Sequence, residues 1–185
     1  MKFFNTAGPV NLEDHYALPP LSRLDADELL LLIRQKKYFV LHAPRQTGKT
    51  SLLLALMEHL NSGEEYICLY ANIETARTAR SNVEQGIYEV TRAIAESASV
   101  YLKDKRLRNW VHEENKNAGG HGALSGLLTR WAEESDKPIV LLLDEVDALV
   151  GDTLVSLLRQ LRSGYTRCPA AFPQTVVLCG VRDVK

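Results

Sequence analysis

The order of hydrophobic and polar positions along the chain predicts an alternation of strands and helices. Short apolar runs rich in branched and aromatic residues indicate strands, and longer stretches with apolar residues three and four positions apart indicate helices. The expected strands are 38–41, 66–70, 139–143 and 175–179, and the expected helices lie within 25–37, 49–60, 80–102, 124–134 and 152–163. This alternation predicts an α/β fold, a three-layer αβα sandwich around a parallel sheet.

Capping and turn residues place several element ends. Asp25 or Asp27 can cap the first helix and Asp152 the last one, because carboxylates accept hydrogen bonds from free backbone N–H groups. The glycine-containing stretch 115–122 predicts a loop, since it favours neither helix nor strand. Residues 1–24 show no periodicity and hold three prolines, so we expect an extended lead-in there and one folded domain over 25–185.

Composition adds little to this picture. The 185 residues carry 22 Lys and Arg against 23 Asp and Glu, and 45% are hydrophobic. This suits one folded domain, and a net charge of -1 gives no overall attraction to nucleic acid or an anionic membrane. The three cysteines show no C-x-x-C spacing and the apolar runs are too short for a membrane span, so we expect reduced thiols in a cytoplasmic protein.

The segment 43–50, Ala-Pro-Arg-Gln-Thr-Gly-Lys-Thr, carries the strongest chemical pattern in the chain. It matches the phosphate-binding loop (P-loop, Walker A) at every defined position except the first, where Ala43 replaces Gly. In such a loop, backbone N–H groups at a helix N-terminus surround phosphate oxygens. Gly48 permits the close approach, Lys49 places a cation on the β- and γ-phosphates, and the Thr50 hydroxyl can ligate Mg²⁺.

The neighbouring elements support this interpretation. The segment follows an expected strand and opens an expected helix, which is the context in which the pattern binds phosphate. The alternative is a capped helix start that binds nothing. The candidate nucleotide-binding residues of the loop are Ala43, Pro44, Arg45, Gln46, Thr47, Gly48, Lys49, Thr50 and Ser51.

A second motif, Leu-Leu-Leu-Asp-Glu, ends an apolar strand in two acids, as in a Walker B site. We expect Asp144 at the tip of a strand neighbouring the P-loop strand, where it would hold Mg²⁺ through water. Glu145 would orient the attacking water or take its proton. The alternative is an acidic pair that only stabilises a helix N-terminus. A P-loop about 95 residues upstream favours the catalytic interpretation.

These two motifs and their spacing resemble the AAA-like P-loop ATPases, including the signal-transducing STAND type, in the ASCE division with an acidic catalytic residue beside Walker B. The opening residues 2–9 and the close 179–183 also look like a group of bacterial AAA-like ATP-binding proteins. The resemblance covers nearly the whole chain, and the two motifs are its specific part.

The resemblance implies a P-loop NTPase fold with strand order 5-1-4-3-2, and ATP and Mg²⁺ as cofactors. It implies that Asn72, at the end of the second strand, restrains the glutamate, although Asn72 is equally typical of a strand-end turn. It also places Arg182, or Asp183, at the γ-phosphate sensor. Because the family has a fifth strand and usually a helical lid, the resemblance predicts that the 185 residues are an N-terminal fragment lacking both.

Partners are less well indicated. The basic cluster 103–108 with Trp110 could contact a nucleic-acid backbone, although such runs are more often solvated helix faces. Arg159, Arg162 and Arg167 could reach a neighbouring subunit of a homo-oligomer, with surface placement as the default. Unknown protein partners would bind through a missing C-terminal region. The resemblance places adenine contacts at Tyr16, Pro19, Pro20 and Arg23, which packing of the lead-in explains equally well.

The sequence therefore predicts an ATPase domain that acts on the β–γ phosphoanhydride bond. Glu145, Lys49 and Arg182 are the expected catalytic residues, and Thr50 and Asp144 the expected magnesium ligands. The alternative function is an ATP-gated switch or regulatory module with little turnover. A small-molecule kinase is a third interpretation, which the Asp-Glu pair suits less because it serves water.

Overall fold

The computed structural model describes residues 13–16, 20–23, 26–42, 44 and 47–180. Within these residues, a four-stranded parallel sheet in the order β1-β4-β3-β2 forms the middle layer. The strands are β1 Phe39–His42, β2 Ile67–Asn72, β3 Ile139–Asp144 and β4 Thr175–Gly180. This arrangement confirms the expected α/β class, and its order matches the 1-4-3-2 part of the expected sheet.

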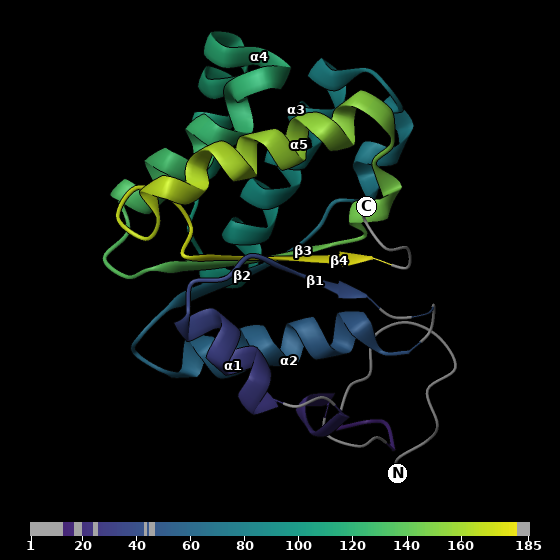
Figure 1. Ribbon diagram of the computed structural model, residues 1–185, viewed down its shortest axis with the longest axis vertical. Coiled ribbons are helices and arrows are strands. Elements are labelled where there is room, and N and C mark those ends of the chain that lie inside the picture. The colour runs from purple at the N-terminus through teal and green to yellow at the C-terminus, as the bar shows by residue number, and fades with distance from the viewer. Residues whose placement is uncertain (1–12, 17–19, 24–25, 43, 45–46, 181–185) are drawn as a thin grey trace.

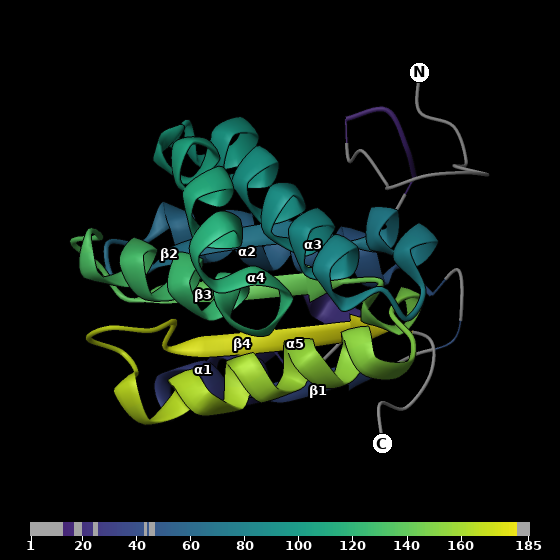
Figure 2. The ribbon, with the colours of Figure 1, turned by 90° about the horizontal axis from the view of Figure 1, so that it is seen from above.

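Helices cover both faces of the sheet (Figure 1). On one face lie α1 Ala26–Arg34 and α2 Lys49–Ser62, and on the other α3 Val83–Ser97, α4 Arg106–Glu133 and α5 Gly151–Gly164. Seen from above, α5 runs along β4 (Figure 2). Short turns complete the description: 3-10 helices at Pro20–Arg23, Glu74–Ala79, Val146–Ala148 and Tyr165–Arg167, and a π-helical turn at Ala98–Leu102. None of the described helices has the length and apolar content of a membrane span.

From the Walker B motif we expected the strand that carries Asp144 to neighbour the P-loop strand. In the structure it does not. β4 lies between them, and Val177 pairs with Phe39 of β1 on one side and with Leu142 of β3 on the other. The expectation was wrong because two strands can present side chains to one site at the same sheet edge without pairing with each other. The observed order agrees with the 1-4-3-2 part of the order 5-1-4-3-2 that the resemblance implies.

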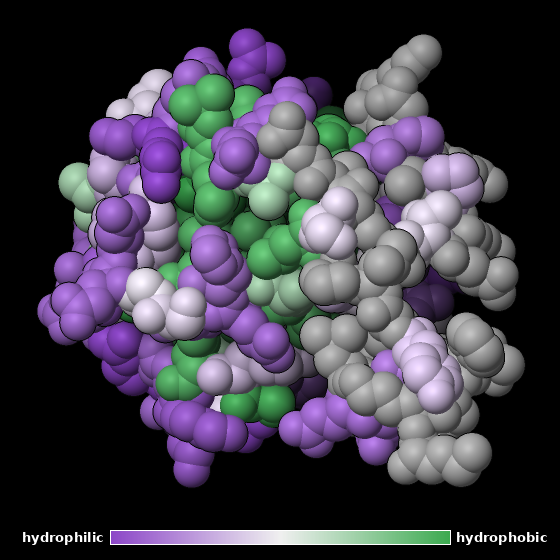
Figure 3. Space-filling view, turned by 90° about the horizontal axis from the view of Figure 1, so that it is seen from below, coloured by the Kyte–Doolittle hydropathy of each residue, from purple (hydrophilic) through white to green (hydrophobic). Residues whose placement is uncertain are grey.

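Side chains alternate between the two faces of the sheet and build two separate cores. Leu69, Leu141 and Leu143 pack toward α3, α4 and α5, whereas Tyr70 and Leu142 pack toward α1 and α2. All six residues of β3 are buried, as expected for a central strand. On the α1 and α2 side, hydrophobic side chains reach the surface in a band between hydrophilic ones (Figure 3).

Residues 115–122 lie inside α4 and not in the loop that their glycines predict. Only Gly119 leaves helical geometry, with φ 55° and ψ -162°. Neighbouring elements bond to the backbone at this break: the Gly120 N–H donates to Glu84 Oε2 (2.8 Å), and the Gly120 carbonyl accepts from Ser156 Oγ (2.7 Å) and Gln160 Nε2 (3.0 Å). These tertiary hydrogen bonds hold a helix that local propensity disfavours.

The expected caps are also corrected. α5 begins after Val150 with no side-chain cap, and Asp152 lies in its first turn, where its charge favours the helix N-terminus. Asp27 likewise lies in the first turn of α1, and Asp25 lies outside the described residues. Most of the expected lead-in 1–24 also lies outside them.

Candidate functional site

The P-loop candidates connect β1 to the N-terminus of α2. Gly48, immediately before the helix, has φ 84°, a left-handed conformation that favours glycine. Thr47 Oγ1 and Lys49 Nζ each donate a hydrogen bond to the Pro44 carbonyl, both at 2.8 Å. The loop therefore closes on Pro44 and keeps the Lys49 ammonium at the helix N-terminus. Ala43, Arg45 and Gln46 lie outside the described residues.

Thr50 and Asp144 meet at this edge of the sheet. Thr50, in the first turn of α2, donates from Oγ1 to Asp144 Oδ2 at 2.8 Å, and Ser51 follows it in the helix. Asp144 is 1% exposed, and its Oδ1 accepts the Glu145 backbone N–H at 3.0 Å. A buried carboxylate requires such donors, because burial removes the water that would otherwise solvate its charge.

Tyr70 supplies a further donor to Asp144. Its hydroxyl donates to Asp144 Oδ2 at 3.2 Å from β2. Burial raises the pKa of Tyr70, and the charge of Asp144 raises it further, so the phenol stays protonated and acts as the donor. No sequence pattern marks this residue, because Tyr70 is one of several aromatic residues in short apolar runs.

The donor set fits a magnesium ion. Thr50 and Asp144 offer a hydroxyl and a carboxylate oxygen that converge from two elements, and Mg²⁺ prefers oxygen ligands. The described residues hold no cluster of three or more His, Cys, Asp or Glu side chains suited to a metal by themselves. Two protein ligands completed by water and phosphate oxygens are the usual arrangement for Mg²⁺ at a nucleotide site.

Glu145 follows β3 in an unusual backbone conformation. Its φ of 60° and ψ of 37° are left-handed, which non-glycine residues adopt rarely. Partial burial raises the pKa of the Glu145 carboxyl, and the charges of Asp144, Asp147 and Glu74 raise it further, against a lowering by Lys49. The carboxylate is therefore a stronger base than an exposed glutamate.

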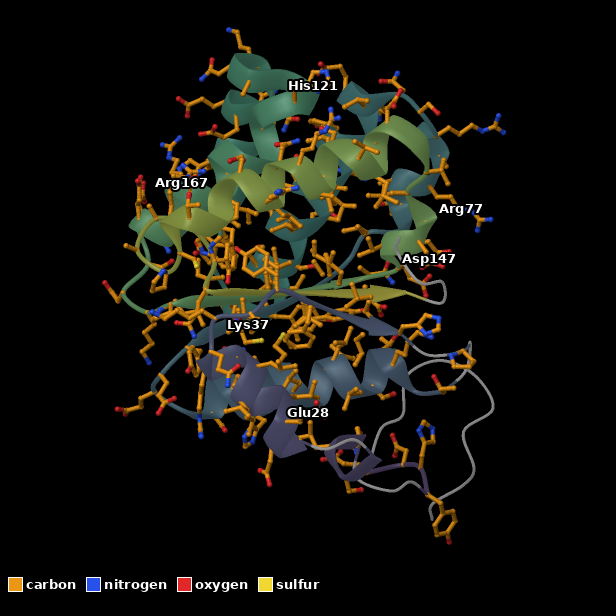
Figure 4. The ribbon with its side chains drawn as sticks, viewed as in Figure 1. Glu28, Lys37, Arg77, His121, Asp147 and Arg167 are labelled. Atoms are coloured by element: carbon orange, nitrogen blue, oxygen red, sulfur yellow. The ribbon has the colours of Figure 1, made fainter. Side chains whose placement is uncertain are left out.

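Asp147 is a second residue of the site that was not predicted from the sequence. Its Oδ1 is buried and has no hydrogen-bond partner within the described part of the chain. A Cβ at Gly180 would lie 2.7 Å from this oxygen, so the end of β4 accommodates Asp147 only because residue 180 is glycine. Figure 4 shows Asp147 at the sheet edge where β4 ends. The signal available was the Asp-Glu-x-Asp spacing after an apolar strand.

The two residues placed by resemblance have different outcomes. Asn72 lies at the end of β2 in register with Asp144, and its Oδ1 accepts the Glu74 N–H at 2.8 Å. That contact supports the strand-end turn, and a restraint on Glu145 stays a prediction. Arg182 and its alternative Asp183 lie outside the described residues, so the sensor also stays a prediction.

The basic side chains of the cluster 103–108 are exposed, and the ring of Trp110 beside them is covered. Trp110 is 7% exposed, and the Arg106 and Arg130 guanidinium groups lie 5.7 and 4.7 Å from its ring centroid. Arg106 also pairs with Asp104 at 2.8 Å. A base has no open ring to stack on here, which favours the solvated helix face.

The arginines expected at a subunit contact lie apart from the carboxylates or on the exposed face of α5. The residues expected to contact adenine gain little support. Arg167 lies toward the opposite end of the sheet from Asp147 (Figure 4), where it donates to Ser125 Oγ at 3.2 Å. Arg159 and Arg162 are exposed on α5. Among the adenine candidates, Pro19 lies outside the described residues and Tyr16 is 57% exposed.

Comparison with known proteins gives a family and a distant structural likeness. A family model described as an AAA domain matches residues 33–185. A solved structure titled "Structure of Drosophila ORC bound to DNA" is similar with a TM-score of 0.42 and 15% identity, over 100% of this chain and 48% of that one. The chain thus spans about half the length of that protein. The search of curated proteins gave no match.

Proposed function

The chain belongs to the AAA domain family, and on this basis we propose that it binds ATP with Mg²⁺ and hydrolyses the β–γ phosphoanhydride bond. The observation that carries the proposal is the contact between Thr50 and Asp144, 2.8 Å apart beside the P-loop lysine. A hydroxyl from the loop helix and a carboxylate from the strand end are the two protein groups that such a site requires.

The P-loop residues bind the phosphates. Gly48 gives the left-handed turn that lets the backbone approach them, and the N-terminus of α2 favours their negative charge. Lys49 Nζ has three donors, one of which the Pro44 carbonyl accepts, and its charge compensates the β- and γ-phosphates.

Thr50 and Asp144 hold the magnesium ion. When bound, Mg²⁺ neutralises charge that develops on the phosphate oxygens. The Thr50 hydroxyl, the Tyr70 hydroxyl and the Glu145 backbone N–H all donate hydrogen bonds to the Asp144 carboxylate. The protein therefore provides a fixed carboxylate direction before any ligand arrives.

Glu145 acts on water. Its raised pKa makes the carboxylate a better proton acceptor, and its left-handed backbone turns the chain sharply after β3. Asp147 contributes by its charge, which is one cause of that raised pKa. The proton taken from the attacking water resides on the Glu145 carboxylate.

The first test is a calorimetric titration with Mg·ATP. We expect the protein to bind, Lys49→Ala to lose binding, and Lys37→Ala to bind as the unmodified protein does, because Lys37 is an exposed lysine before β1. Equal binding by Lys49→Ala would contradict the role of the loop.

The second test is phosphate release under single-turnover conditions. We expect Glu145→Gln to keep ATP binding and lose most turnover, and Glu28→Gln, which changes an exposed glutamate on α1, to keep both. Unchanged turnover in Glu145→Gln would contradict its catalytic role. Binding with almost no phosphate release by the unmodified protein would favour the ATP-gated switch.

A further inference from the structure

The Tyr70 hydroxyl has no role in the phosphate binding or the hydrolysis proposed for this site. Tyr70 is 6% exposed, and its ring faces the apolar layer between the sheet and α2. A phenylalanine would satisfy that packing, whereas a buried phenol needs a hydrogen-bond partner. The partner here is Asp144 Oδ2, the same oxygen that Thr50 contacts.

Strand pairing explains how Tyr70 reaches this oxygen. β2 pairs with β3 so that Tyr70 lies opposite Leu142 and Asn72 lies opposite Asp144. Tyr70 is therefore the diagonal neighbour of Asp144, two residues back on the adjacent strand. With strands about 4.8 Å apart and a rise of about 3.3 Å per residue, such neighbours lie about 8 Å apart, which a tyrosine side chain can span.

Tyr70 is itself fixed from several sides. Its backbone N–H donates to Met57 Sδ at 3.4 Å, which ties it to α2. Its ring meets the Tyr101 ring edge to face, with centroids 6.1 Å apart and an interplanar angle of 82°. A donor held in this way limits the rotation of the carboxylate that it contacts.

We propose that Tyr70 is a positioning residue that sets the direction of Asp144 Oδ2 toward the Thr50 hydroxyl, and thereby the affinity of the site for Mg²⁺. The inference rests on the proposed function, in which Thr50 and Asp144 hold that ion. Without the phenol, the carboxylate keeps the hydrogen bonds from Thr50 and the Glu145 backbone and gains freedom to turn. Binding of Mg²⁺ then has to restore an orientation that the protein no longer imposes.

The test is Tyr70→Phe, which removes one oxygen and keeps the ring. The measurement is ATP affinity by calorimetry at a series of MgCl₂ concentrations and again in EDTA. We expect the half-saturating Mg²⁺ concentration to rise about tenfold, the usual scale for losing a partner of a metal ligand. Affinity for ATP in EDTA should stay the same. Tyr66→Phe is the matched control, because Tyr66 packs partly buried against the same apolar layer.

A second comparison tests whether the Tyr70 hydroxyl acts through Asp144. Adding Tyr70→Phe to Asp144→Asn should bring no further loss of Mg²⁺ dependence, because the group that Tyr70 positions is already changed. Thermal unfolding without nucleotide shows whether each variant folds.

Three results would overturn the inference. Unchanged Mg²⁺ dependence in Tyr70→Phe would show that the hydroxyl does not position Asp144. Equal weakening with and without Mg²⁺ would assign Tyr70 a general packing role. Absence of Mg²⁺-dependent ATP binding in the unmodified protein and in Tyr66→Phe would remove the proposed function itself, and this failure is distinct because it does not depend on Tyr70.

Discussion

Asp104 and Asp144 are both carboxylates that accept several hydrogen bonds, and they differ in their exposure to water. Asp144 is 1% exposed at the sheet edge, whereas the Asp104 side chain before α4 is 14% exposed and its partner Arg106 is 45% exposed. Asp104 Oδ1 accepts the Arg106 backbone N–H at 3.0 Å, and Oδ2 accepts its guanidinium at 2.8 Å. Asp104 thus stabilises the first turn of α4 as a helix cap does.

Asp104 makes the start of α4 sensitive to acid. The hydrogen bond from the Arg106 side chain lowers the pKa of Asp104 below its usual value. Its stabilising effect is therefore complete above the pKa of the unfolded chain, near 3.9, and is lost as the pH falls through the lower folded value.

The corresponding variant is Asp104→Asn. We expect its free energy of unfolding at pH 7 to be lower by about 0.5–1 kcal/mol, because water screens this pair. In urea unfolding, the difference from the unmodified protein should shrink as the pH falls through the folded pKa. A difference that persists equally at low pH would contradict this account, and the exposed Glu65→Gln is the control.

Some of the candidate site could be predicted from single residues and some could not. Gly48, Lys49, Thr50 and Asp144 follow patterns whose chemistry depends on spacing along the chain. Tyr70 acquires its contact only because β2 pairs with β3 in one register. Asp147 likewise depends on a neighbouring strand, since its oxygen lies against Gly180 of β4. The spacing of residues along the chain does not determine which distant strands pair, so these contacts could not be predicted.

At the scale of elements, the apolar pattern predicted each strand to within a residue or two. The prediction succeeded because the apolar residues of the strands are the ones that the fold buries. For example, β3 is the most apolar run and is buried at every position. The pattern failed at α4, where the glycines of 115–122 disfavour a helix. Contacts from Glu84, Ser156 and Gln160 outweigh that preference, and they come from α3 and α5.

The break in α4 at Gly119 allows a test of how tertiary contacts and local helix propensity contribute there. Gly119 has φ 55° and ψ -162°, and a Cβ there would lie 3.0 Å from both Glu84 carboxylate oxygens. We expect Gly119→Ala to lower the free energy of unfolding by about 1–3 kcal/mol, measured by chemical denaturation. Gly63→Ala is the control, because its φ is -85° and its Cβ would meet only the Leu60 carbonyl at 3.5 Å. Equal stability of the two variants would contradict the assignment.

At the scale of the whole molecule, the sheet separates a larger core under α3, α4 and α5 from a smaller one under α1 and α2. Phe172 belongs to the larger core and is fully buried. A Cβ at Gly164 would overlap its ring, and the Arg167 guanidinium lies 5.4 Å from the ring centroid. Phe172 thus joins the end of α5 to the start of β4.

Truncating this side chain tests how far the larger core stabilises the molecule. We expect Phe172→Ala to lower the free energy of unfolding by about 3–5 kcal/mol in urea, because the ring leaves a cavity in a packed layer. Val100→Ala, at a residue 56% exposed, should change it little. A small effect at Phe172 would mean that α5 adjusts to fill the space.

The left-handed backbone at Glu145 lowers the stability of the fold at a residue that the proposed activity requires. A residue other than glycine or asparagine in this conformation costs about 1 kcal/mol, and the carboxyl also stands near Asp144, Asp147 and Glu74. Glu145→Asn should therefore unfold at a higher denaturant concentration than the unmodified protein while releasing no phosphate. If the inactive variant is more stable in urea than the unmodified protein, selection for stability alone would replace this glutamate.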